Sequence, residues 1–519
     1  MKSGTDRWSA YCQLVPGTAP GWRLEMVTPP SRLGGSNGMS VGPDGRLYVT
    51  QVFFSQVTAI DIETGAHSVF CPLGAGITGP DDAIFGADGT LYATEPMFGR
   101  VTARVSDGSY RVVHEDLPAA NGITMDHAHR RLFVDEFRPG GRLLELDPTG
   151  TAAPRVLLED LAGPNALAMG PDGRLYFPQV FADQVWSYDL DSGEARRVVD
   201  ELARPTALKF DSRGRLVISE AAAGRVTAVD LATGGRQVLA DVPLGIDNVS
   251  VGAGDRLFVS HYVDGRVSEE TAGRRRILSE PGLLGPHGLA VDAQGTILFA
   301  DGLSVGVVVD GSCERRIRLL IDLPTLAIGV CPFAGALAVL GAGGEVLRYD
   351  HSGGQPTVLT TGLTDPTSMR ADGDRLIVSE RAPGRLSAVD RDGNVTPLVE
   401  GLPSAASVDL LDGGYAVSAG PTVVLIDPNR NERRIDGFGD AQGVAVVGST
   451  VFVADAERHE IVAIDRTSGR RDVVVFGAPV GLPVAGTVPA AFGPLTADGA
   501  GGVLIGGNGD GSIRRLIRA

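Results

Sequence analysis

Polar residues able to do chemistry recur at two fixed positions of a repeated phrase in the first half of the chain. The first position lies just before an apolar run and holds Asn37, Asp81, Asn121, Asn165, Thr206 and Asp247. The second position ends the next apolar run and holds Gln51, Glu95, Glu136, Gln179, Glu220 and His261. Carboxylates that a fold gathers in one place repel one another unless they are protonated or bridged by a cation. Oxygen ligands of this kind suit calcium or magnesium.

The repeated phrase itself specifies short strands. It reads GMSVGPDGRLYVTQ from Gly38, AIFGADGTLYATE from Ala83 and ALAMGPDGRLYFPQ from Ala166. Its apolar residues alternate or run for about five positions, which favours strands, and its D-G pairs favour hairpin turns. A period of about 40 residues with four strands per copy is typical of a propeller blade, and the chain carries roughly twelve copies. The sequence therefore predicts an all-β protein with two six-bladed β-propellers and about twelve four-stranded blades.

The domain boundary follows from this division. We place the first propeller, with the active site, at residues 1–269 and a second, structural propeller at residues 270–519. The segment WRLEMVTPP from Trp22 is predicted to close the first ring as the missing strand of its sixth blade, and RRRILSEPG from Arg274 would close the second ring. In the alternative closure, the N-terminal strand pairs with the C-terminal SIRRLIRA and ties the two rings together. The sequence leaves both closures open.

Propeller geometry predicts which side chains meet. The first strand of each blade lines the central channel, and its start lies on the same face as the end of the second strand. The polar residues of the first half therefore point toward one axis. The second half offers few ligands at these positions, which hold His287, Thr367 and Gln442, and Gly341, Ala419 and Gly507. We therefore place the active site in the first ring.

Aromatic residues gather in the loops that follow the second strands of the first ring. These loops carry Phe53, Phe54, Met97, Phe98, Phe137, Phe181 and Tyr262, whereas the equivalent loops of the second half carry no aromatic residue. An apolar rim above a polar floor is typical of a small-molecule pocket. The predicted substrate contacts are Phe53, Phe98, Phe137, Phe181 and Tyr262 on the rim, and Asn37, Gln51 and Gln179 on the floor.

Two segments carry a resemblance to known propeller families. GPHGLAVDAQGTILFADG from Gly285 is similar to an NHL repeat, and ANGITMDHAHRRLFVDE from Ala120 resembles the N-G-L segment of the senescence-marker-protein/gluconolactonase family. The resemblance implies a six-bladed propeller with a divalent metal, often calcium, in its channel, and lactone hydrolysis as a common activity. Asn121 matches the asparagine of the N-G-L segment, and Asp81 or Asp247 matches an aspartate of the family. Asn37 stands where the family has a glutamate.

These observations support hypotheses from two classes. In the first, the protein is a lactonase or esterase-type hydrolase of an apolar or aromatic carbonyl substrate. A divalent ion on Asp81, Asn121, Asn165 and Asp247 polarises the carbonyl, and the candidate acid–base groups are Glu95, Glu136, Glu220 and His261. A lyase or cyclising enzyme would use a channel glutamate instead. In the second class, the protein is a non-catalytic scaffold with NHL-like faces.

Composition excludes several other classes. The net charge is −17 and the pI is about 4.9, so the phosphate backbone of a nucleic acid would be repelled. No apolar run is long enough for a membrane span or a signal peptide. Cys12, Cys71, Cys313 and Cys331 form no C-x-x-C pair, which favours reduced thiols. We therefore expect a cytoplasmic protein with a small-molecule substrate and no organic cofactor, membrane or nucleic-acid partner; the oligomeric state stays open.

Overall fold

The computed structural model describes residues 14–128, 130–271, 273–350, 353–481 and 493–519. Strands dominate this part of the chain, whose only helical segments are the 3-10 turns η1 (Val180–Ala182) and η2 (Ala253–Asp255). None of its helices is long and apolar enough to cross a membrane. The chain divides into two compact units, of which the first contains residues 32–281 and the second contains residues 14–31 and 282–519.

The first unit consists of six successive antiparallel sheets of four strands each, within the described residues. The first three sheets are β3 (Met39–Val41), β4 (Leu47–Gln51), β5 (Gln56–Ile60) and β6 (His67–Cys71); β7 (Ala83–Phe85), β8 (Leu91–Glu95), β9 (Arg100–Arg104) and β10 (Tyr110–His114); and β11 (Ala120–Asp126), β12 (Arg131–Glu136), β13 (Pro139–Leu146) and β14 (Arg155–Ala162). The last three sheets are β15 (Ala168–Met169), β16 (Leu175–Gln179), β17 (Gln184–Tyr188) and β18 (Ala195–Val199); β19 (Pro205–Phe210), β20 (Leu216–Glu220), β21 (Arg225–Val229) and β22 (Arg236–Asp241); and β23 (Ile246–Gly252), β24 (Arg256–His261), β25 (Val267–Thr271) and β26 (Arg274–Ser279).

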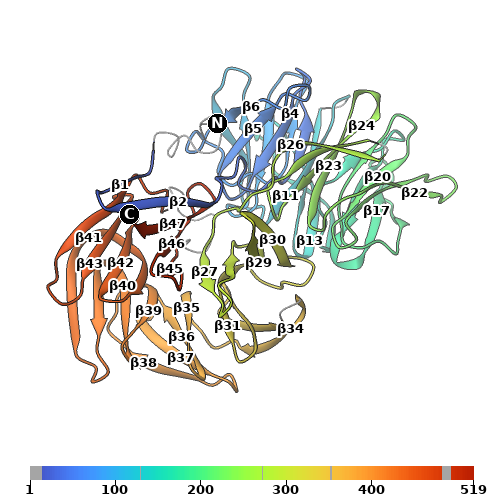
Figure 1. The fold of residues 1–519 in the computed structure, drawn as a ribbon. Helices are drawn as coiled ribbons and strands as arrows, with labels where there is room; N and C mark the ends of the chain where they lie inside the picture. Colours follow the sequence, from blue (N-terminus) through green and yellow to red (C-terminus); the bar gives the residue numbers. More distant parts are fainter. Residues whose placement is uncertain (1–13, 129, 272, 351–352, 482–492) are drawn as a thin grey trace. The chain divides into compact units, whose positions relative to one another are not determined.

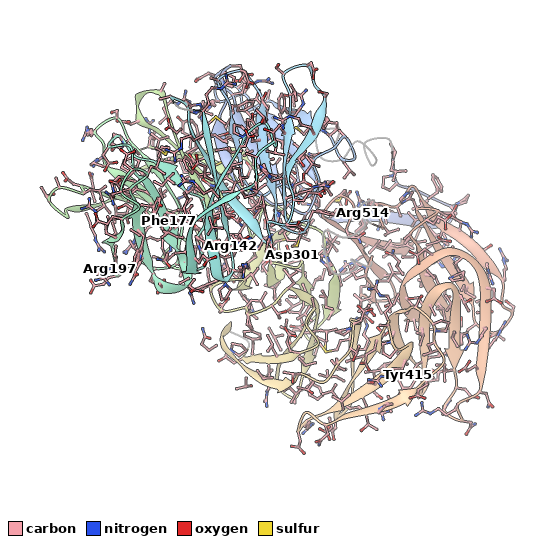
Figure 2. All side chains as sticks on the ribbon, turned by 180° about the vertical axis from the view of Figure 1, so that it is seen from behind. Arg142, Phe177, Arg197, Asp301, Tyr415 and Arg514 are labelled. Carbon is pink, nitrogen blue, oxygen red and sulfur yellow. The ribbon has the colours of Figure 1, made fainter. Side chains whose placement is uncertain are left out.

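The first strand of each sheet, here called the inner strand, contacts the inner strand of the next sheet. The series runs from β3 through β7, β11, β15, β19 and β23, and β23 in turn contacts β3. Apolar side chains fill the space between neighbouring sheets, as where Tyr176 and Val185 pack against Leu208 and Ile218. Figure 2 shows Phe177, which is fully buried, inside this unit and Arg197 at its surface. The repeated phrase thus folds into four-stranded sheets consistent with propeller blades, and the prediction of an all-β fold is confirmed.

The second unit repeats this pattern with two irregularities. Its regular sheets are β27 (Gly288–Val291), β28 (Ile297–Ala300), β29 (Ser304–Val309) and β30 (Ser312–Arg318); β31 (Ala327–Phe333), β32 (Ala336–Gly341), β33 (Val346–Asp350) and β34 (Gly353–Thr360); and β35 (Pro366–Asp372), β36 (Arg375–Glu380), β37 (Arg385–Asp390) and β38 (Val395–Val399). A seven-stranded sheet follows, with β39 (Ala405–Leu411), β40 (Gly414–Ile426), β41 (Glu432–Val447), β42 (Thr450–Asp455), β43 (Glu460–Asp465), β44 (Arg471–Phe476) and β1 (Gly17–Thr18). The last sheet contains β45 (Leu495–Ala497), β46 (Val503–Gly507), β47 (Ser512–Arg518) and β2 (Trp22–Thr28).

The long strands β40 and β41 explain the seven-stranded sheet. The pairing registers shift at Gly420 and at Ala441, so β40 supplies two adjacent strands of one blade-like part, and β41 continues from that part into the next. The inner strands again contact one another in order, from β27 through β31, β35, β39, β41 and β45, and β45 contacts β27. Figure 1 shows these strands from yellow to red along the chain.

The predicted closure of the first unit by the N-terminal strand is wrong. β2 pairs with β47 of the second unit, from Trp22 opposite Arg518 to Thr28 opposite Ile513. The first unit does not need this strand, because a short hairpin leads from β25 directly to β26, whose Arg275 and Arg276 pair with glutamates of β25. The alternative closure, between the two ends of the chain, is therefore the observed one. The compact units meet in sequence at residues 281 and 282, and not at the predicted 269 and 270.

Because β2 belongs to the second unit, the two fragments made by dividing the chain between residues 281 and 282 should differ in stability. Residues 32–281 contain every strand of their sheets and should fold alone. Residues 282–519 lack β2, which exposes the edge of β47 and removes Leu24 and Val27 from their apolar clusters. We expect this fragment to unfold at a clearly lower temperature, and to recover when residues 14–31 are joined after residue 519 through a short linker. Circular dichroism melts would contradict the closure if the added segment changed nothing.

Candidate functional site

Four polar side chains from four different sheets meet where the inner strands of the first unit begin. Asn37 donates from Nδ2 to Oδ1 of Asp81 over 3.3 Å, and it also hydrogen-bonds Asp247. Asn121 hydrogen-bonds Asp81 from the other side. These four residues, here called the central cluster, therefore form one chain of contacts. The sequence predicted all four at this place.

The charges of the central cluster are poorly compensated. Burial raises the pKa of Asp81 well above its usual range, and the negative charges of Asp247 and Asp82 raise it further. Burial also raises the pKa of Asp247 to about 7, with a further contribution from Asp82. The hydrogen bonds from Asn121 and Asn37 act in the opposite direction, but they do not offset the repulsion. Near neutral pH the two carboxyls must therefore share protons or bind a cation.

Three ionisable residues next to this cluster were not predicted from the sequence. Asp82 follows Asp81 and accepts from the backbone N–H of Ala83 over 2.9 Å; burial raises its pKa, and the charge of Lys209 opposes this. Lys209 lies on β19, where burial lowers the pKa of its amine and Asp82 opposes the change. The signal for Lys209 was available, because it and Lys2 are the only lysines in the chain.

Asp135 is the third missed residue, and it is fully buried immediately before the end of β12. Its Oδ1 accepts from the N–H of Gly122 over 2.9 Å, and burial raises its pKa to about 8. The equivalent residues Ser219 and Ser260 use their hydroxyls to donate to a carbonyl of the next inner strand, over 3.1 and 2.7 Å. Asp135 therefore stands at the position of a hydroxyl, and near neutral pH it carries a proton as a hydroxyl does.

The central cluster fits a divalent cation. Asn121 is 7% exposed, and within the described residues its Oδ1 has no hydrogen-bond partner. This orphaned acceptor stands beside Asp81, and amide and carboxylate oxygens are the ligands that calcium and magnesium prefer. No group of three or more His, Cys, Asp or Glu side chains in the described part of the chain is arranged for a metal, so the donors would be two carboxylates with amide oxygens. Asn165, the fourth predicted ligand, is buried, and no hydrogen bond joins it to the described residues of the cluster.

The glutamates predicted as acid–base groups are held by arginines of their own sheets. Glu95 pairs with Arg100 at 2.7 Å, Glu136 pairs with Arg138 at 2.8 Å and with Arg142, and Glu220 pairs with Arg225 at 2.8 Å. Burial acts to raise the pKa of Glu220, but the bonds from Arg225 and Thr227 outweigh it, and the pKa lies below its usual value.

The same arrangement occurs in the second unit, where Glu380 pairs with Arg385 at 2.7 Å. Three of these side chains also accept from the backbone of the preceding loop: Glu95 from Thr78 over 3.1 Å, Glu220 from Ala203 over 3.0 Å and Glu380 from Thr364 over 2.7 Å. Gln51 and Gln179 accept in the same way from Gly34 and Ala162. We therefore interpret this position as a loop clamp of the repeat, while the catalytic role of the glutamates and the floor role of the glutamines stay predictions. His261 is fully buried at the end of β24, and its backbone is bonded to Ser36, so the structural interpretation suits it best.

The aromatic rim is narrower than predicted. Phe53, Phe54 and Tyr262 are buried; a Cβ atom on Gly34 would lie 1.5 Å from the ring of Phe54, so that glycine lets the ring fold inward. Phe98 and Phe181 are 40% and 39% exposed, and the ring centres of Phe137 and Phe181 lie 5.3 Å apart. The exposed apolar surface therefore comes from the loops that follow β8, β12 and β16.

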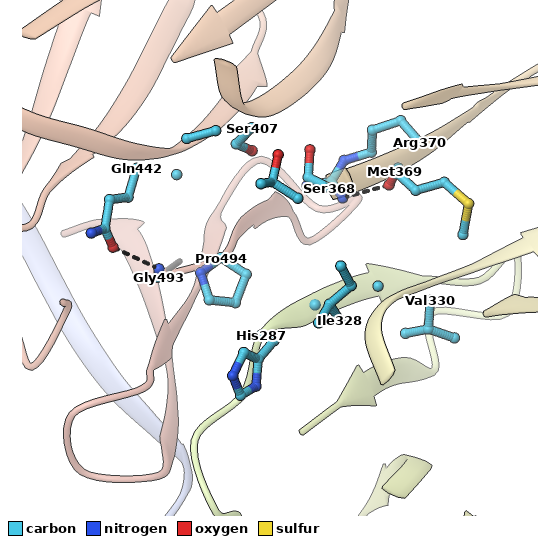
Figure 3. Close-up of a pocket in the computed structure, with 15 residues that line it drawn as sticks. His287, Ile328, Val330, Ser368, Met369, Arg370, Ser407, Gln442, Gly493 and Pro494 are labelled. Atoms are coloured by element: carbon cyan, nitrogen blue, oxygen red, sulfur yellow. Dashed lines mark hydrogen bonds between the residues drawn. The ribbon is translucent and has the colours of Figure 1, made fainter. Parts of the chain in front are cut away.

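The centre of the second unit has little room. Its inner strands line a cavity with His287, Thr367, Ser407 and Gln442, in which Gln442 Oε1 accepts from the N–H of Gly493 over 3.2 Å (Figure 3). The volume open to the centres of water molecules is about 10 Å³, which is room for about one water. Burial lowers the pKa of His287 to about 4. The structural role of this unit stays a prediction.

Comparisons with known proteins agree with the resemblance predicted from the sequence. Residues 22–260 match the model of the SMP-30/gluconolactonase/LRE-like region. Virginiamycin B lyase from Staphylococcus aureus is 18% identical, with a TM-score of 0.39 and coverage of 54% of this chain and 96% of the lyase. The calcium-binding protein regucalcin from Agrobacterium tumefaciens is 17% identical, with a TM-score of 0.37 and coverage of 46% of this chain and 85% of regucalcin. No curated protein matches the chain.

The raised pKa of Asp135 predicts a pH dependence of stability. A carboxyl whose pKa is raised in the folded state stabilises that state fully below its pKa in the unfolded chain, near 4, and this contribution is lost as the pH rises from there to about 8. The thermal midpoint of the first unit should therefore fall from about pH 5 to about pH 8 and then level off, and the fall should be smaller in Asp135→Asn, which cannot ionise. Asp374→Asn, at an exposed carboxylate of the second unit, is the matched control. Parallel curves for the wild type and Asp135→Asn would contradict the assignment.

Proposed function

We propose that the first unit is a six-bladed β-propeller enzyme that acts on a small carbonyl compound, a lactone or ester, with a divalent cation held by the central cluster. The observation that supports this proposal most directly is the series of hydrogen bonds that joins Asn121, Asp81, Asn37 and Asp247. It places two carboxylates beside an amide oxygen that has no partner among the described residues. The match of residues 22–260 to the SMP-30/gluconolactonase/LRE-like region supports the same reaction class.

The order of the sheets supports the ring in this proposal. Each unit presents six inner strands that contact one another in sequence, with the last in contact with the first. Six blades around one axis account for this series, and for the interaction of Asp82 with Lys209, whose sheets are not neighbours in that series. The second unit is on this view a structural propeller.

Each residue of the central cluster has a distinct task in this proposal. When bound at this place, a divalent cation would supply polarisation of a carbonyl and a lowered pKa of a water. Asp81 and Asp247 would hold the cation with their carboxylates, and Asn121 would contribute its free Oδ1. Asn37 orients both carboxylates through its amide. The apolar part of the substrate would lie against Phe98, Phe137 and Phe181.

A second candidate function needs no metal. The pKa of Asp247 is raised to about 7, so this residue can take up and release a proton near neutral pH, which is what acid–base catalysis requires. Asp81 and Asp247 would then share a proton as a coupled pair and serve a lyase or cyclising reaction. A non-catalytic scaffold explains the cluster less well, because burying crowded carboxylates costs stability without a gain for binding at the faces.

Metal binding decides between the first two candidates. We expect the wild type to retain about one calcium or magnesium ion per chain after gel filtration, as measured by elemental analysis. Asp81→Asn with Asp247→Asn should lose the ion, because both charged ligands are gone. Glu220→Gln should keep the ion but unfold at a lower temperature, because Arg225 loses its partner. Wild-type protein that stays free of metal at millimolar calcium or magnesium would contradict the metal-dependent function and favour the carboxyl pair.

The exposed rim should control affinity for the apolar part of a ligand. Truncating Phe98 or Phe181 to alanine removes roughly 1–3 kcal/mol of apolar burial, which weakens binding by about one to two orders of magnitude. Titration with an aromatic lactone measures the effect. Phe476→Ala, which removes an aromatic side chain that is 50% exposed on the second unit, is the control and should bind as the wild type does. Equal losses of affinity in all three variants would contradict the placement of the ligand site at the loops that carry Phe98 and Phe181.

A further inference from the structure

Lys209 and Arg370 occupy the same position in the two units. Lys209 pairs across its sheet with Val217, three residues before Glu220, and Arg370 pairs with Ile377, three residues before Glu380. Both glutamates are the loop clamps at the end of the second strand. The two basic side chains therefore start from the same height on an inner strand, and their surroundings can be compared directly.

Arg370 is held by several partners in the second unit. Its Nη2 donates to the carbonyl of Leu495 over 2.6 Å, and its Nε lies 3.5 Å from Oδ1 of Asp409. Asp409 belongs to the next inner strand and accepts from the N–H of Val446 over 2.7 Å. The ion pair and these two hydrogen bonds together link β35, β39, β41 and β45. Arginine suits this position because it is a permanent cation with several donors.

Lys209 has none of these partners. The position of Asp409 is taken in the first unit by Ser250, which pairs with Phe258 three residues before the end of its second strand, as Asp409 pairs with Ala416. Among the described residues, no hydrogen bond or ion pair holds the Lys209 amine, and Asp82 acts on it only through its charge. Lys209 is half-buried as a residue, and burial lowers the pKa of its amine.

The choice of lysine is itself informative. The chain has 46 basic residues, and all except Lys2 and Lys209 are arginines. A permanent structural cation is therefore provided by arginine almost everywhere, including the equivalent position 370. Lysine differs from arginine in that it can lose its proton inside a protein and then act as a nucleophile.

From this comparison, we propose that the Lys209 amine is a covalent binding site for a small aldehyde or ketone, which it holds as an imine. The uncharged amine nitrogen adds to the carbonyl carbon, and the carbonyl oxygen takes up two protons and leaves as water while the C=N bond forms. Both protons come from the two N–H bonds of the attacking amine, the second of them from the carbinolamine nitrogen, so no oxidant or reductant is consumed. The site does not depend on the divalent cation of the proposed function.

Reductive trapping tests this site without any turnover. The protein is incubated near neutral pH with glycolaldehyde and cyanoborohydride, and the mass of the peptide that contains residue 209 is followed over time. An N-acetyl-lysine amide in the same tube is the reference amine. We expect Lys209 to react about tenfold faster than the reference, because a lowered pKa leaves more uncharged amine, and the rate should be the same with EDTA or with calcium.

Two matched variants separate a reactive amine from a fixed counter-charge. Ser250→Asp supplies the acid that the first unit lacks, and it should slow labelling of Lys209 to the reference rate or below. Arg370→Lys places an amine beside Asp409 in the second unit, and this introduced amine should react more slowly than the reference. If Lys209 reacts no faster than the reference amine, or no faster than the amine introduced by Arg370→Lys, the proposal is overturned and Lys209 only balances the charge of Asp82. The Arg370→Lys comparison also decides the matter if Ser250→Asp fails to fold.

Discussion

Repulsion between crowded carboxyls, two of them buried and two half-buried, at the centre of the first unit is the constraint on which the rest of the site depends. Asp82, Asp135 and Asp247 each raise the pKa of Asp81, Asp82 also raises that of Asp135 and Asp247, and Lys209 is the cation that acts on Asp82. Such crowding lowers stability unless protons or a bound cation relieve it. The fold itself does not require uncompensated carboxyls at its centre, as the second unit shows. There Arg370 and Asp409 neutralise each other, and the central cavity has room for about one water.

The two units therefore show that one repeat can carry different residues at its centre. Both use the loop clamp, in which a side chain at the end of the second strand bonds the preceding loop, as Glu220 and Glu380 do. The units differ in the residues at the start and middle of the inner strands, where side chains are not needed to stabilise the four-stranded sheet. Function is expected at positions of this kind, because their residues can vary without loss of the hairpins and apolar clusters that maintain the sheets.

The repeat, the strand pattern and the four residues of the central cluster could be predicted from the sequence, because each depends on local spacing within one phrase. The roles of Asp135 and Lys209 could not, since they depend on pairing registers that bring different sheets together. The ion pairs of the glutamates were readable in part: Glu95 and Arg100, Glu220 and Arg225, and Glu380 and Arg385 are all five residues apart across a hairpin. Ring closure stayed ambiguous because either outer strand, from Trp22 or from Arg274, has the pattern to complete a sheet.

Proton release on cation binding tests the central claim most directly. If the carboxyls of the central cluster share protons until a cation displaces them, adding calcium or magnesium to unbuffered protein near pH 7 should release protons, in proportion to the ion bound and until the site is full. A pH indicator together with calorimetry measures both quantities in one titration. Binding without proton release, or no binding at all, would contradict the account that crowded carboxyls form the site.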